Sequence, residues 1–290
     1  MDIKAILGGV LFAFIWASAF TSARIIVTNA PPLTVSAIRF LIAGILTLVI
    51  ARALSQSFRL SPAQWRLTVV FGICQNALYL GLNFVAMQTV EASLAAIIAS
   101  SLPLFVAFAG WLILGETVRP LGIVGLFAGL AGVLMIMGTR LTAGVDPFGV
   151  ALCVIAALAL TSATLALRGA SSGGNVLVVV GYQMLIGSAA LWVPALAFET
   201  WAFNWTGEVI AAFIYTILAP GIFATILWFW LVRRIGTVRA STFHFLTPFF
   251  GVAVAALLLG ETIGGLDVLG VVIITLAILV VQLSKTPQKS

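Results

Sequence analysis

Residues 112–117 read LILGET, and residues 257–262 read LLLGET. The two Gly-Glu-Thr triplets lie 145 positions apart in a chain of 290 residues, so each triplet occupies the same place in its half. Charged residues make up only 8% of the chain, which makes a repeated charged triplet conspicuous. The pair therefore indicates an internal duplication with a period of half the chain.

The composition places this chain in a lipid bilayer. Hydrophobic residues make up 62% of it, and its charged fraction is far below the roughly 25% of soluble domains. The net charge of +6 is not gathered in a dense basic patch, so the sequence predicts no nucleic-acid partner. Cys74 and Cys153 both lie in apolar runs, which indicates neither a disulfide framework nor a metal site.

Ten stretches are apolar and long enough to cross a bilayer, which takes about 20 residues in a helix. The first is too long for the apolar region of a signal peptide, so we expect it to remain as a span. The connections between stretches are very short. The predicted spans cover residues 4–27, 33–52, 66–88, 92–114, 119–139, 147–168, 175–197, 208–232, 238–259 and 266–284.

The basic residues predict the orientation, because Lys and Arg gather on the cytoplasmic side of membrane proteins. With the N-terminus inside, 11 of the 14 basic residues fall in cytoplasmic segments, whereas Arg24 and Arg140 fall outside and Arg39 lies within a span. We therefore expect an integral protein of a bacterial inner membrane with both termini in the cytoplasm. The inside residues are Lys4, Arg52, Arg59, Arg66, Arg119, Arg168, Arg233, Arg234, Arg239, Lys285 and Lys289.

This orientation places the first triplet inside the cell and the second outside. An odd number of helices in a repeated unit has that effect, because the second copy must enter the membrane from the opposite side. The sequence therefore predicts an all-α membrane protein with ten transmembrane helices. They form two inverted five-helix repeats, residues 1–140 and 146–284, around a central cavity.

Other matches between the halves support the duplication. Pro103 and Pro248 each precede the glycine of their triplet by twelve residues, and Gly125 matches Gly270 at the same offset of 145. IRFLIAG (38–44) resembles YQMLIGS (182–188) at an offset of 144.

The repeated pattern resembles the EamA family of the drug/metabolite transporter superfamily over nearly the whole chain. It is carried by the two Pro-x11-Gly-Glu-Thr segments, each followed by a Gly-rich helix, and by WASAF at 16–20. Within that family the similarity is to bacterial exporters of aromatic amino acids. The resemblance implies export of small metabolites, above all amino acids including aromatic ones, by alternating access.

Each triplet is expected to connect two helices. Gly115 and Gly260 suit a left-handed helix end, and the acid and hydroxyl that follow favour the next helix N-terminus. Glu116 and Glu261 as ion-coupling carboxylates are the alternative, although both lie at membrane edges.

The third span carries a polar face, formed by Gln75, Asn76, Tyr79 and Asn83. Their spacing of i, i+1, i+4 and i+8 puts them on one side of a helix. Such groups are costly in a membrane unless they face water, ligand or one another. We predict that this face lines the cavity; hydrogen bonding between packed helices is the alternative.

The remaining candidates for a binding or pore-lining role are polar or aromatic residues within spans, for which ordinary helix packing is the alternative. They are Trp16, Ser18 and Thr21 in the first span, Ser100 and Ser101 in the fourth, Thr161 and Thr164 in the sixth, Gln183 in the seventh and His244 in the ninth. Pro103 and Pro248 are expected to kink the fourth and ninth spans, as gates or ligand contacts.

Arg39 and His244 are the ionisable residues inside predicted spans. Arg39 has three open roles: attracting a substrate carboxylate, pairing with helix-end carbonyls, or extending to the outer interface. His244 either couples protons or is a neutral core residue. Trp228 and Trp230, just before Arg233 and Arg234, predict an interfacial aromatic belt.

The sequence lacks the residues of several other functions. It has no acidic residue at mid-depth, no phosphate-binding loop, no nucleophile–base pair and a single histidine, so we expect no enzyme, cofactor or metal site. Other cargoes remain as alternatives: quaternary ammonium drugs, nucleotide sugars or triose phosphates, together with a membrane-embedded lipid enzyme or a non-transporting subunit. The expected partners are a small-molecule substrate and the bilayer, and the short connections are compatible with a monomer.

Overall fold

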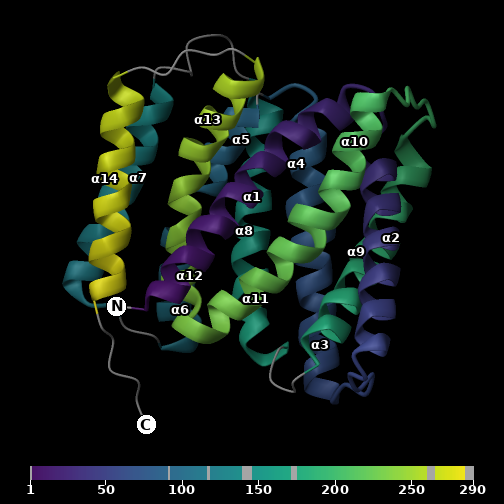
Figure 1. The fold of residues 1–290 in the computed structure, drawn as a ribbon, viewed down its shortest axis with the longest axis horizontal. Coiled ribbons are helices and arrows are strands. Elements are labelled where there is room, and N and C mark those ends of the chain that lie inside the picture. The colour runs from purple at the N-terminus through teal and green to yellow at the C-terminus, as the bar shows by residue number, and fades with distance from the viewer. Residues whose placement is uncertain are drawn as a thin grey trace.

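The computed structural model describes residues 2–90, 92–115, 118–138, 146–170, 175–259 and 265–284. Within these ranges the regular structure is entirely helical, in ten consecutive segments (Figure 1). The segments are α1 (Ile3–Val27), α2 (Pro32–Ala53), α3–η1–α4 (Pro62–Phe71, Gly72–Leu80, Gly81–Ala86), α5–α6 (Ala92–Ala99, Leu102–Leu114), α7 (Pro120–Gly138), α8 (Pro147–Ala170), α9 (Val176–Phe198), α10–η2–α11 (Gly207–Thr216, Ile217–Phe223, Ala224–Ile235), α12–η3–α13 (Thr237–Ser241, Thr242–Leu246, Thr247–Leu259) and α14 (Gly265–Leu283).

The outer surface of the helices is suited to lipid. Six described helices are long and apolar enough to cross a membrane. Large apolar side chains project from the bundle, among them Leu112 (64% exposed), Phe127 (61%) and Val193 (71%). Water would disfavour so much exposed apolar area. The prediction of an all-helical membrane protein is confirmed.

The third helix begins earlier than the predicted residue 66. Ser61 caps its N-terminus by accepting a hydrogen bond from the backbone N–H of Gln64, and the Gln64 side chain accepts one from the backbone N–H of Ser61. This reciprocal capping box, with Pro62 as the first helical residue, starts the helix one turn before the apolar run.

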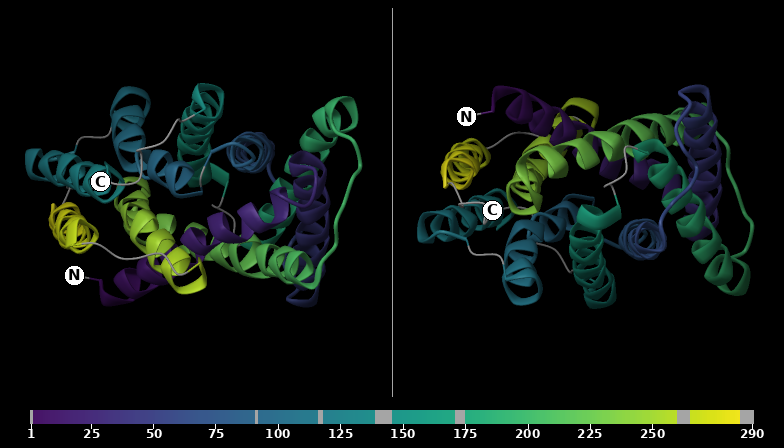
Figure 2. Two further views of the ribbon diagram at one scale, coloured as in Figure 1. Left: turned by 90° about the horizontal axis from the view of Figure 1, so that it is seen from above. Right: turned by 90° about the horizontal axis from the view of Figure 1, so that it is seen from below.

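Two antiparallel helix pairs make the most extensive contacts, α2 with α9 and α7 with α14. The pairs lie at opposite ends of the molecule, as Figures 1 and 2 show together. The remaining segments pack between them. The N-terminal end of α1 and the C-terminal end of α14 lie at the same end of the bundle (Figure 1).

The α2–α9 pair makes reciprocal contacts. Ser188 Oγ donates a hydrogen bond to the Ala37 carbonyl at 2.8 Å. On the same interface, a Cβ at Gly44 would lie 3.0 Å from the Gly181 carbonyl oxygen. A shift of 144 positions, the offset between the similar segments, converts Ala37 to Gly181 and Gly44 to Ser188. Each contact is therefore the image of the other under that shift.

The α7–α14 pair repeats this arrangement. A Cβ at Gly125 would lie 3.1 Å from the Ala277 carbonyl oxygen, and one at Gly132 would lie 3.0 Å from the Gly270 carbonyl oxygen. A shift of 145 positions converts Gly125 to Gly270 and Gly132 to Ala277. The glycines allow the two backbones to approach closely, as small residues do in membrane helix pairs.

Side chains also cap the α2–α9 pair at both ends. The Glu199 carboxylate accepts hydrogen bonds from the backbone N–H groups of Leu33 and Thr34, each at 2.7 Å. At the other end, Gln56 Oε1 accepts one from the Leu177 N–H at 3.1 Å. Acceptors beyond each helix C-terminus thus satisfy free N–H groups at the partner's N-terminus.

Four segments depart from α-helical geometry, and they do so at matching places. The π-helices η1 and η2 begin at Gly72 and Ile217, which are 145 positions apart. In η2, Pro220 cannot donate to the carbonyl four residues earlier, which removes one α-helical hydrogen bond. Helices α6 and α13 likewise start anew at Leu102 and Thr247, again 145 apart.

The prolines of the fourth and ninth segments occupy the second position of these new helices. Pro103 follows Leu102 in α6, and Pro248 follows Thr247 in α13. The interruption therefore precedes each proline and is not a mid-helix kink, because proline is well tolerated in the first turn. Where the broken segments meet, Ser100 Oγ lies 3.3 Å from the His244 carbonyl oxygen, to which it donates.

Candidate functional site

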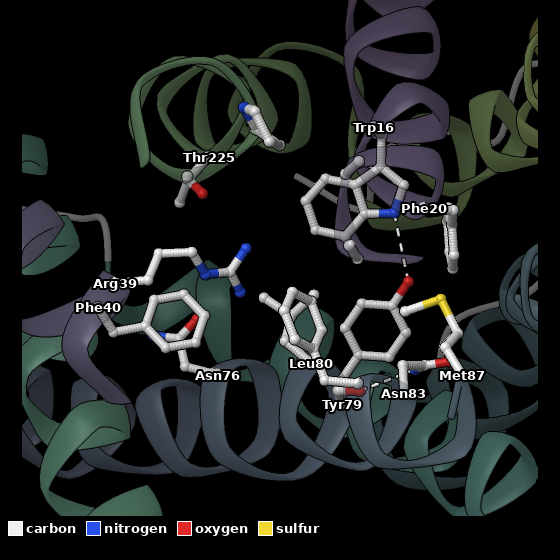
Figure 3. A pocket seen from close by; sticks show the side chains of 15 residues that line it. Trp16, Phe20, Arg39, Phe40, Asn76, Tyr79, Leu80, Asn83, Met87 and Thr225 are labelled. Carbon is white, nitrogen blue, oxygen red and sulfur yellow. Dashed lines mark hydrogen bonds between the residues drawn. The ribbon is translucent and has the colours of Figure 1, made fainter. Parts of the chain in front are cut away.

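A cavity lies among four helical segments, α1, α2, η1–α4 and η2–α11 (Figure 3). The centres of water-sized molecules can occupy about 30 Å³ of it, which is room for about two waters. Its lining residues are Trp16, Ala19, Phe20 and Ala23 from α1, Arg39 and Phe40 from α2, Asn76, Tyr79, Leu80, Asn83, Phe84 and Met87 from the third segment, and Pro220, Gly221 and Thr225 from the eighth.

One wall of the cavity is formed by Trp16 and Tyr79. Their rings stack with centroids 6.0 Å apart and planes nearly parallel, at 6°. Trp16 Nε1 donates a hydrogen bond to the Tyr79 hydroxyl at 3.3 Å, so the polar edge of each ring is satisfied. The contact joins α1 to the π-helical part of the third segment and presents a flat aromatic surface.

Two amides of the third segment also line the cavity. Asn76 Nδ2 donates to the backbone carbonyl of Gln183 at 3.0 Å and also bonds its side-chain oxygen, which ties η1 to α9. Asn83 Nδ2 donates to the Tyr79 carbonyl at 2.8 Å, but its Oδ1 is buried without a hydrogen-bond partner. A buried acceptor with no partner among the described residues is costly, and Asn83 is a lining residue of the cavity.

Arg39 projects from α2 into the cavity, opposite the Trp16–Tyr79 wall (Figure 3). It is 3% exposed, so it does not extend to the outer interface. Its guanidinium carbon lies 4.4 Å from the ring centroid of Phe40 and 4.7 Å from that of Phe84. Its Nε and Nη2 are buried and make no hydrogen bond to any described residue, so these atoms do not pair with the helix-end carbonyls that the structure describes.

An aromatic cluster closes the space on the N-terminal side of Trp16. Phe12 and Trp228 stack at 5.0 Å, and the His244 ring meets Phe12, Trp16 and Trp228 edge-on at 5.2, 5.9 and 5.0 Å. Neither ring nitrogen of His244 has a hydrogen-bond partner among the described residues. His244 therefore belongs to this packed cluster and does not line the cavity.

The interfacial-belt prediction is wrong for Trp228, which is 2% exposed. Its ring packs inward on Phe12 and His244, because the helix turns that face to the bundle core. Trp230 is half-buried, and the Arg234 guanidinium lies 5.2 Å from its ring centroid.

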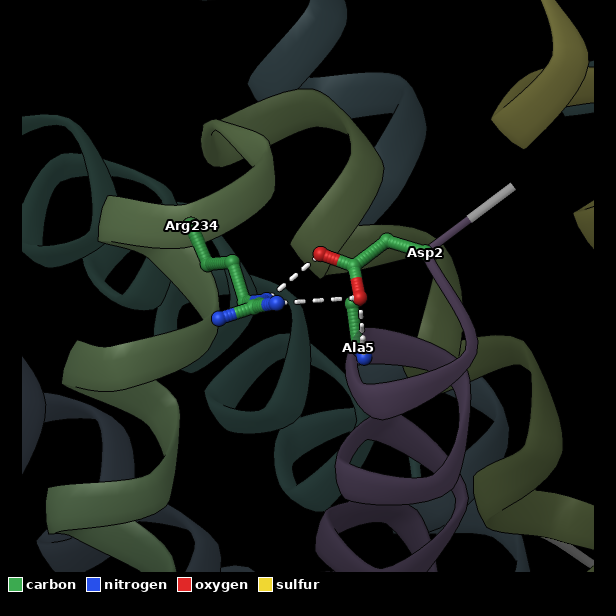
Figure 4. A network of polar contacts seen from close by, with 3 residues as sticks. All are labelled: Asp2, Ala5 and Arg234. Atoms are coloured by element: carbon green, nitrogen blue, oxygen red, sulfur yellow. Dashed lines mark hydrogen bonds and ion pairs between the residues drawn. The ribbon is translucent and has the colours of Figure 1, made fainter.

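An ion pair joins the N-terminal end of α1 to the C-terminal end of α11 (Figure 4). Arg234 Nε and Nη2 donate to the two carboxylate oxygens of Asp2 at 2.5 and 3.2 Å. Asp2 Oδ1 also accepts a hydrogen bond from the Ala5 N–H at 3.2 Å, which caps α1. The Arg234 guanidinium holds the pKa of Asp2 below its usual range.

This ion pair predicts a pH-dependent effect of Asp2→Asn. Because the pKa of Asp2 is lowered in the folded protein, its contribution is complete above the ordinary carboxyl pKa and is lost as the pH falls through the folded value. We expect a small fall in melting temperature at pH 7 that vanishes in acid. Thermal unfolding of both proteins across pH measures it, and an equal difference at every pH would contradict it.

Several predicted residues lie outside the cavity. Gln75 is buried, with Oε1 lacking a partner, but does not line the cavity. The lining arc of this segment includes Leu80 and Phe84 and leaves out Gln75, so it is shifted from the predicted face. The polar residues alone do not reveal this shift, because the apolar Leu80 and Phe84 share the arc.

The serines and threonines mostly return their hydroxyls to their own helices. Ser18 donates to the Ile15 carbonyl at 2.8 Å and bonds the Tyr215 hydroxyl of α10. Ser100 donates to Ala96 O at 2.8 Å, and Thr161 donates to Ala157 O at 2.9 Å. None of these lines the cavity, as expected for hydroxyls accommodated in packed helices.

The other candidates also lie away from the cavity lining. Thr21 and Ser101 are half-buried, and Thr164 is buried with no partner for its hydroxyl. Gln183 supports Asn76 from behind. At the first triplet, Gly115 ends α6 in a left-handed conformation with φ 64°, as predicted. Glu116, Gly260 and Glu261 lie outside the described residues.

Sequence reasoning did not identify five lining residues that contribute to the chemistry or shape of the cavity. They are Phe40, Phe84, Pro220, Gly221 and Thr225. Pro220 and Gly221 are adjacent inside an apolar span, and such a Pro-Gly pair could have predicted an irregular helix there. The two phenylalanines have no such signal, because an apolar ring facing lipid and one facing a cavity look alike in sequence.

Comparison with known proteins places the chain among transporters. The model of the EamA-like transporter family matches residues 3–138 and 147–283. The uncharacterized transporter YvbV of Bacillus subtilis (strain 168) is 24% identical over 97% of this chain and 93% of its own length. The uncharacterized inner membrane transporter YedA of Escherichia coli (strain K12) is 29% identical over 96% and 90%. A solved crystal structure at 21% identity has the same fold, with a TM-score of 0.78 over 97% of this chain and 96% of that one.

Proposed function

The chain belongs to the EamA-like transporter family, and on that premise we propose that it carries small amphipathic metabolites through the cavity by alternating access. Family membership makes it a transporter of small molecules and not an enzyme. The observation that carries the proposal is the cavity itself. It combines the stacked Trp16–Tyr79 wall with polar atoms of Arg39 and Asn83 that are buried and have no hydrogen-bond partner among the described residues.

Alternating access requires two halves that can exchange their conformations. The reciprocal contacts in the α2–α9 and α7–α14 pairs support an inverted repeat, because each contact has an image under a shift of 144 or 145 positions. The matching π-helices and helix interruptions give further support. The two stretches matched by the family model also agree with halves at 1–140 and 146–284. In such transporters one half rocks against the other around a fixed site.

The cavity as described is too small for a metabolite, so loading must move its walls. The π-helices contribute to the wall on two sides and are frequent at functional sites. The aromatic cluster around His244 and the Asp2–Arg234 pair close the side next to the N-terminal end of α1. The basic-residue pattern predicts that side to be cytoplasmic. We infer that opening toward the cytoplasm separates this cluster.

The leading cargoes are amino acids, aromatic ones included. A stacked Trp16–Tyr79 wall suits an apolar or aromatic side chain. Asn83 and Arg39 offer polar groups to the backbone atoms of an amino acid. Phosphorylated cargoes are less suited, because they call for several basic groups and Arg39 is the only basic residue that lines the described cavity.

Counterflow in proteoliposomes tests the function. Purified protein is reconstituted in vesicles loaded with unlabelled phenylalanine, tryptophan or threonine, and uptake of the labelled amino acid is followed with and without a pH gradient. We expect uptake that is independent of the gradient, because no acidic residue lines the described cavity and His244 is packed among rings. Absence of uptake from folded protein would turn attention to the other cargoes, and dependence on the gradient would favour His244 as the residue that couples protons.

A further inference from the structure

We propose that Arg39 anchors a substrate carboxylate, and that the transporter accepts apolar monocarboxylates without an amino group at least as well as amino acids. The inference rests on the proposed function, whose cavity it uses, and specifies the chemical class of the cargo. It is carried by the state of Arg39 and by the balance of charge around the cavity.

Arg39 has the features of a binding residue. An arginine that stabilises a fold makes hydrogen bonds through its guanidinium, as Arg24 does to the Met87 carbonyl and Arg234 does to Asp2. Arg39 Nε and Nη2 make no such hydrogen bond to any described residue, although both atoms are buried. Its contacts with the Phe40 and Phe84 rings compensate only part of the desolvation of a buried charge. A planar group of donors left open in a cavity matches a carboxylate, which it binds in a bidentate manner.

The charge balance decides between kinds of carboxylate. Of the fifteen lining residues, Arg39 is the only basic one and none is acidic. A bound monoanion makes the occupied cavity neutral, whereas a zwitterion leaves a net positive charge in a medium of low dielectric constant. An ammonium group finds neutral partners only, such as Asn83 Oδ1 and the faces of the aromatic wall. The cavity therefore accommodates an amine but does not demand one.

The position of Arg39 also sets the pose of the cargo. Its guanidinium enters from α2, and the Trp16–Tyr79 wall faces it across the cavity (Figure 3). A carboxylate on Arg39 directs the rest of the molecule toward that wall. An aryl or branched alkyl body fits this direction, because stacking on an aromatic surface rewards an apolar group. A cation without a carboxylate meets the guanidinium unshielded, and repulsion excludes it.

Three probes with the same phenyl body separate these possibilities. They are 3-phenylpropionate (an anion), phenylalanine (a zwitterion) and phenethylamine (a cation). Binding is measured on the purified full-length protein in detergent, by tryptophan fluorescence or by the ligand-induced shift in melting temperature. We expect 3-phenylpropionate to bind at least as tightly as phenylalanine, and phenethylamine to bind about tenfold or more weakly, since a hydrogen-bonded charge pair is lost.

Variants of Arg39 connect the preference to this residue. Arg39→Gln is expected to weaken binding of both carboxylates about tenfold or more, while Arg39→Lys restores part of it through charge without the planar donors. Arg52→Gln, an exposed change on the same helix, is the matched control and leaves all three affinities unchanged. Without ligand, Arg39→Gln should melt no lower than the wild type, because it removes an unpaired buried charge. A structural role would instead lower the melting temperature.

The outcomes separate this inference from the proposed function. Suppose that phenylalanine binds and is exchanged in vesicles. If phenethylamine then binds equally well, or if Arg39→Gln keeps the wild-type order of affinities, the inference about Arg39 is overturned. The proposal that the protein transports amino acids is unaffected by either result. Much tighter binding of phenylalanine than of 3-phenylpropionate also overturns the inference, because the site would then require the amino group. If folded protein neither binds nor exchanges any of these compounds, both this inference and the proposal of amino acids as the cargo fail.

Discussion

Replacing Trp16 by leucine is expected to reduce counterflow of labelled phenylalanine about tenfold or more. Trp16 stacks on Tyr79 and Phe12 with centroids 6.0 and 5.3 Å away, and donates a hydrogen bond to the Tyr79 hydroxyl. Leucine removes the flat surface on which an aromatic cargo rests, and it leaves the Tyr79 hydroxyl without that donor. A loss of about 1.4 kcal/mol or more, within the range for an aromatic pair and a hydrogen bond together, corresponds to this factor.

The control for this prediction is Trp111→Leu. Trp111 is 57% exposed on α6, where its ring lies 6.0 Å from that of Phe108 on the outside of the bundle. The same exchange of side chains at this lipid-facing site should leave counterflow within about twofold of the wild type. Both variants are compared after size-exclusion chromatography establishes a single folded species. Equal counterflow by the wild type and Trp16→Leu would show that the Trp16–Tyr79 wall does not contribute to transport.

Replacing Gly72 by alanine is expected to destabilise the protein strongly for so small a change. An added Cβ would lie 2.6 Å from the carbonyl oxygen of Gln183 and 3.1 Å from its Cα. These are backbone atoms of α9, so neither can move aside as a flexible side chain can. Overpacking of this kind costs about 1–3 kcal/mol or more, and a melting temperature lower by roughly 3–10 °C is expected.

The same substitution should also reduce transport. The Gln183 carbonyl that the new methyl group approaches accepts the hydrogen bond from Asn76 at 3.0 Å. Separating η1 from α9 lengthens that bond and displaces Asn76 from the cavity wall. A variant that melts at a lower temperature but transports normally below that temperature would show that Asn76 does not depend on this contact.

Gly251→Ala provides the matched comparison. Gly251 also lies within a helix, α13, and a Cβ there would meet nothing within 4 Å. Alanine is the better helix former, so this variant should melt at the wild-type temperature or slightly above it. Because membrane proteins often unfold irreversibly, the three proteins are heated at one scan rate in one detergent. A fall at Gly251 equal to that at Gly72 would show that close backbone approach is not the cause.

Much of the fold was predictable from the sequence because it follows from composition and spacing. A chain with 62% hydrophobic residues must place most of them against lipid or one another. Each helix satisfies its own backbone hydrogen bonds, so apolar stretches of sufficient length become helices in a bilayer. The offsets of 144 and 145 positions, read from short matches between the halves, also relate the contacts within the α2–α9 and α7–α14 pairs.

The candidate site was predicted only in part. Trp16, Arg39, Asn76, Tyr79 and Asn83 were named from the sequence and do line the cavity. Their signal was a polar or amphipathic group inside an apolar span, which is costly without a partner. The same signal named Gln75, Ser100 and Thr161, whose environments are packed helices. A polar residue within an apolar span therefore does not by itself show whether its side chain lines a cavity or packs between helices.

The remaining features depend on segments that are distant along the chain. The inward turn of Trp228, the contribution of Phe40 and Phe84 to the cavity and the unfilled donors of Arg39 are properties of neighbouring helices. In a soluble protein, the polar and apolar faces of a helix show which side points inward. In a bilayer both the core and the surroundings are apolar, so that distinction disappears from the sequence. Composition and the length of the apolar stretches determined that this is an all-helical membrane protein, whereas helix packing alone determined which side chains meet around the cavity.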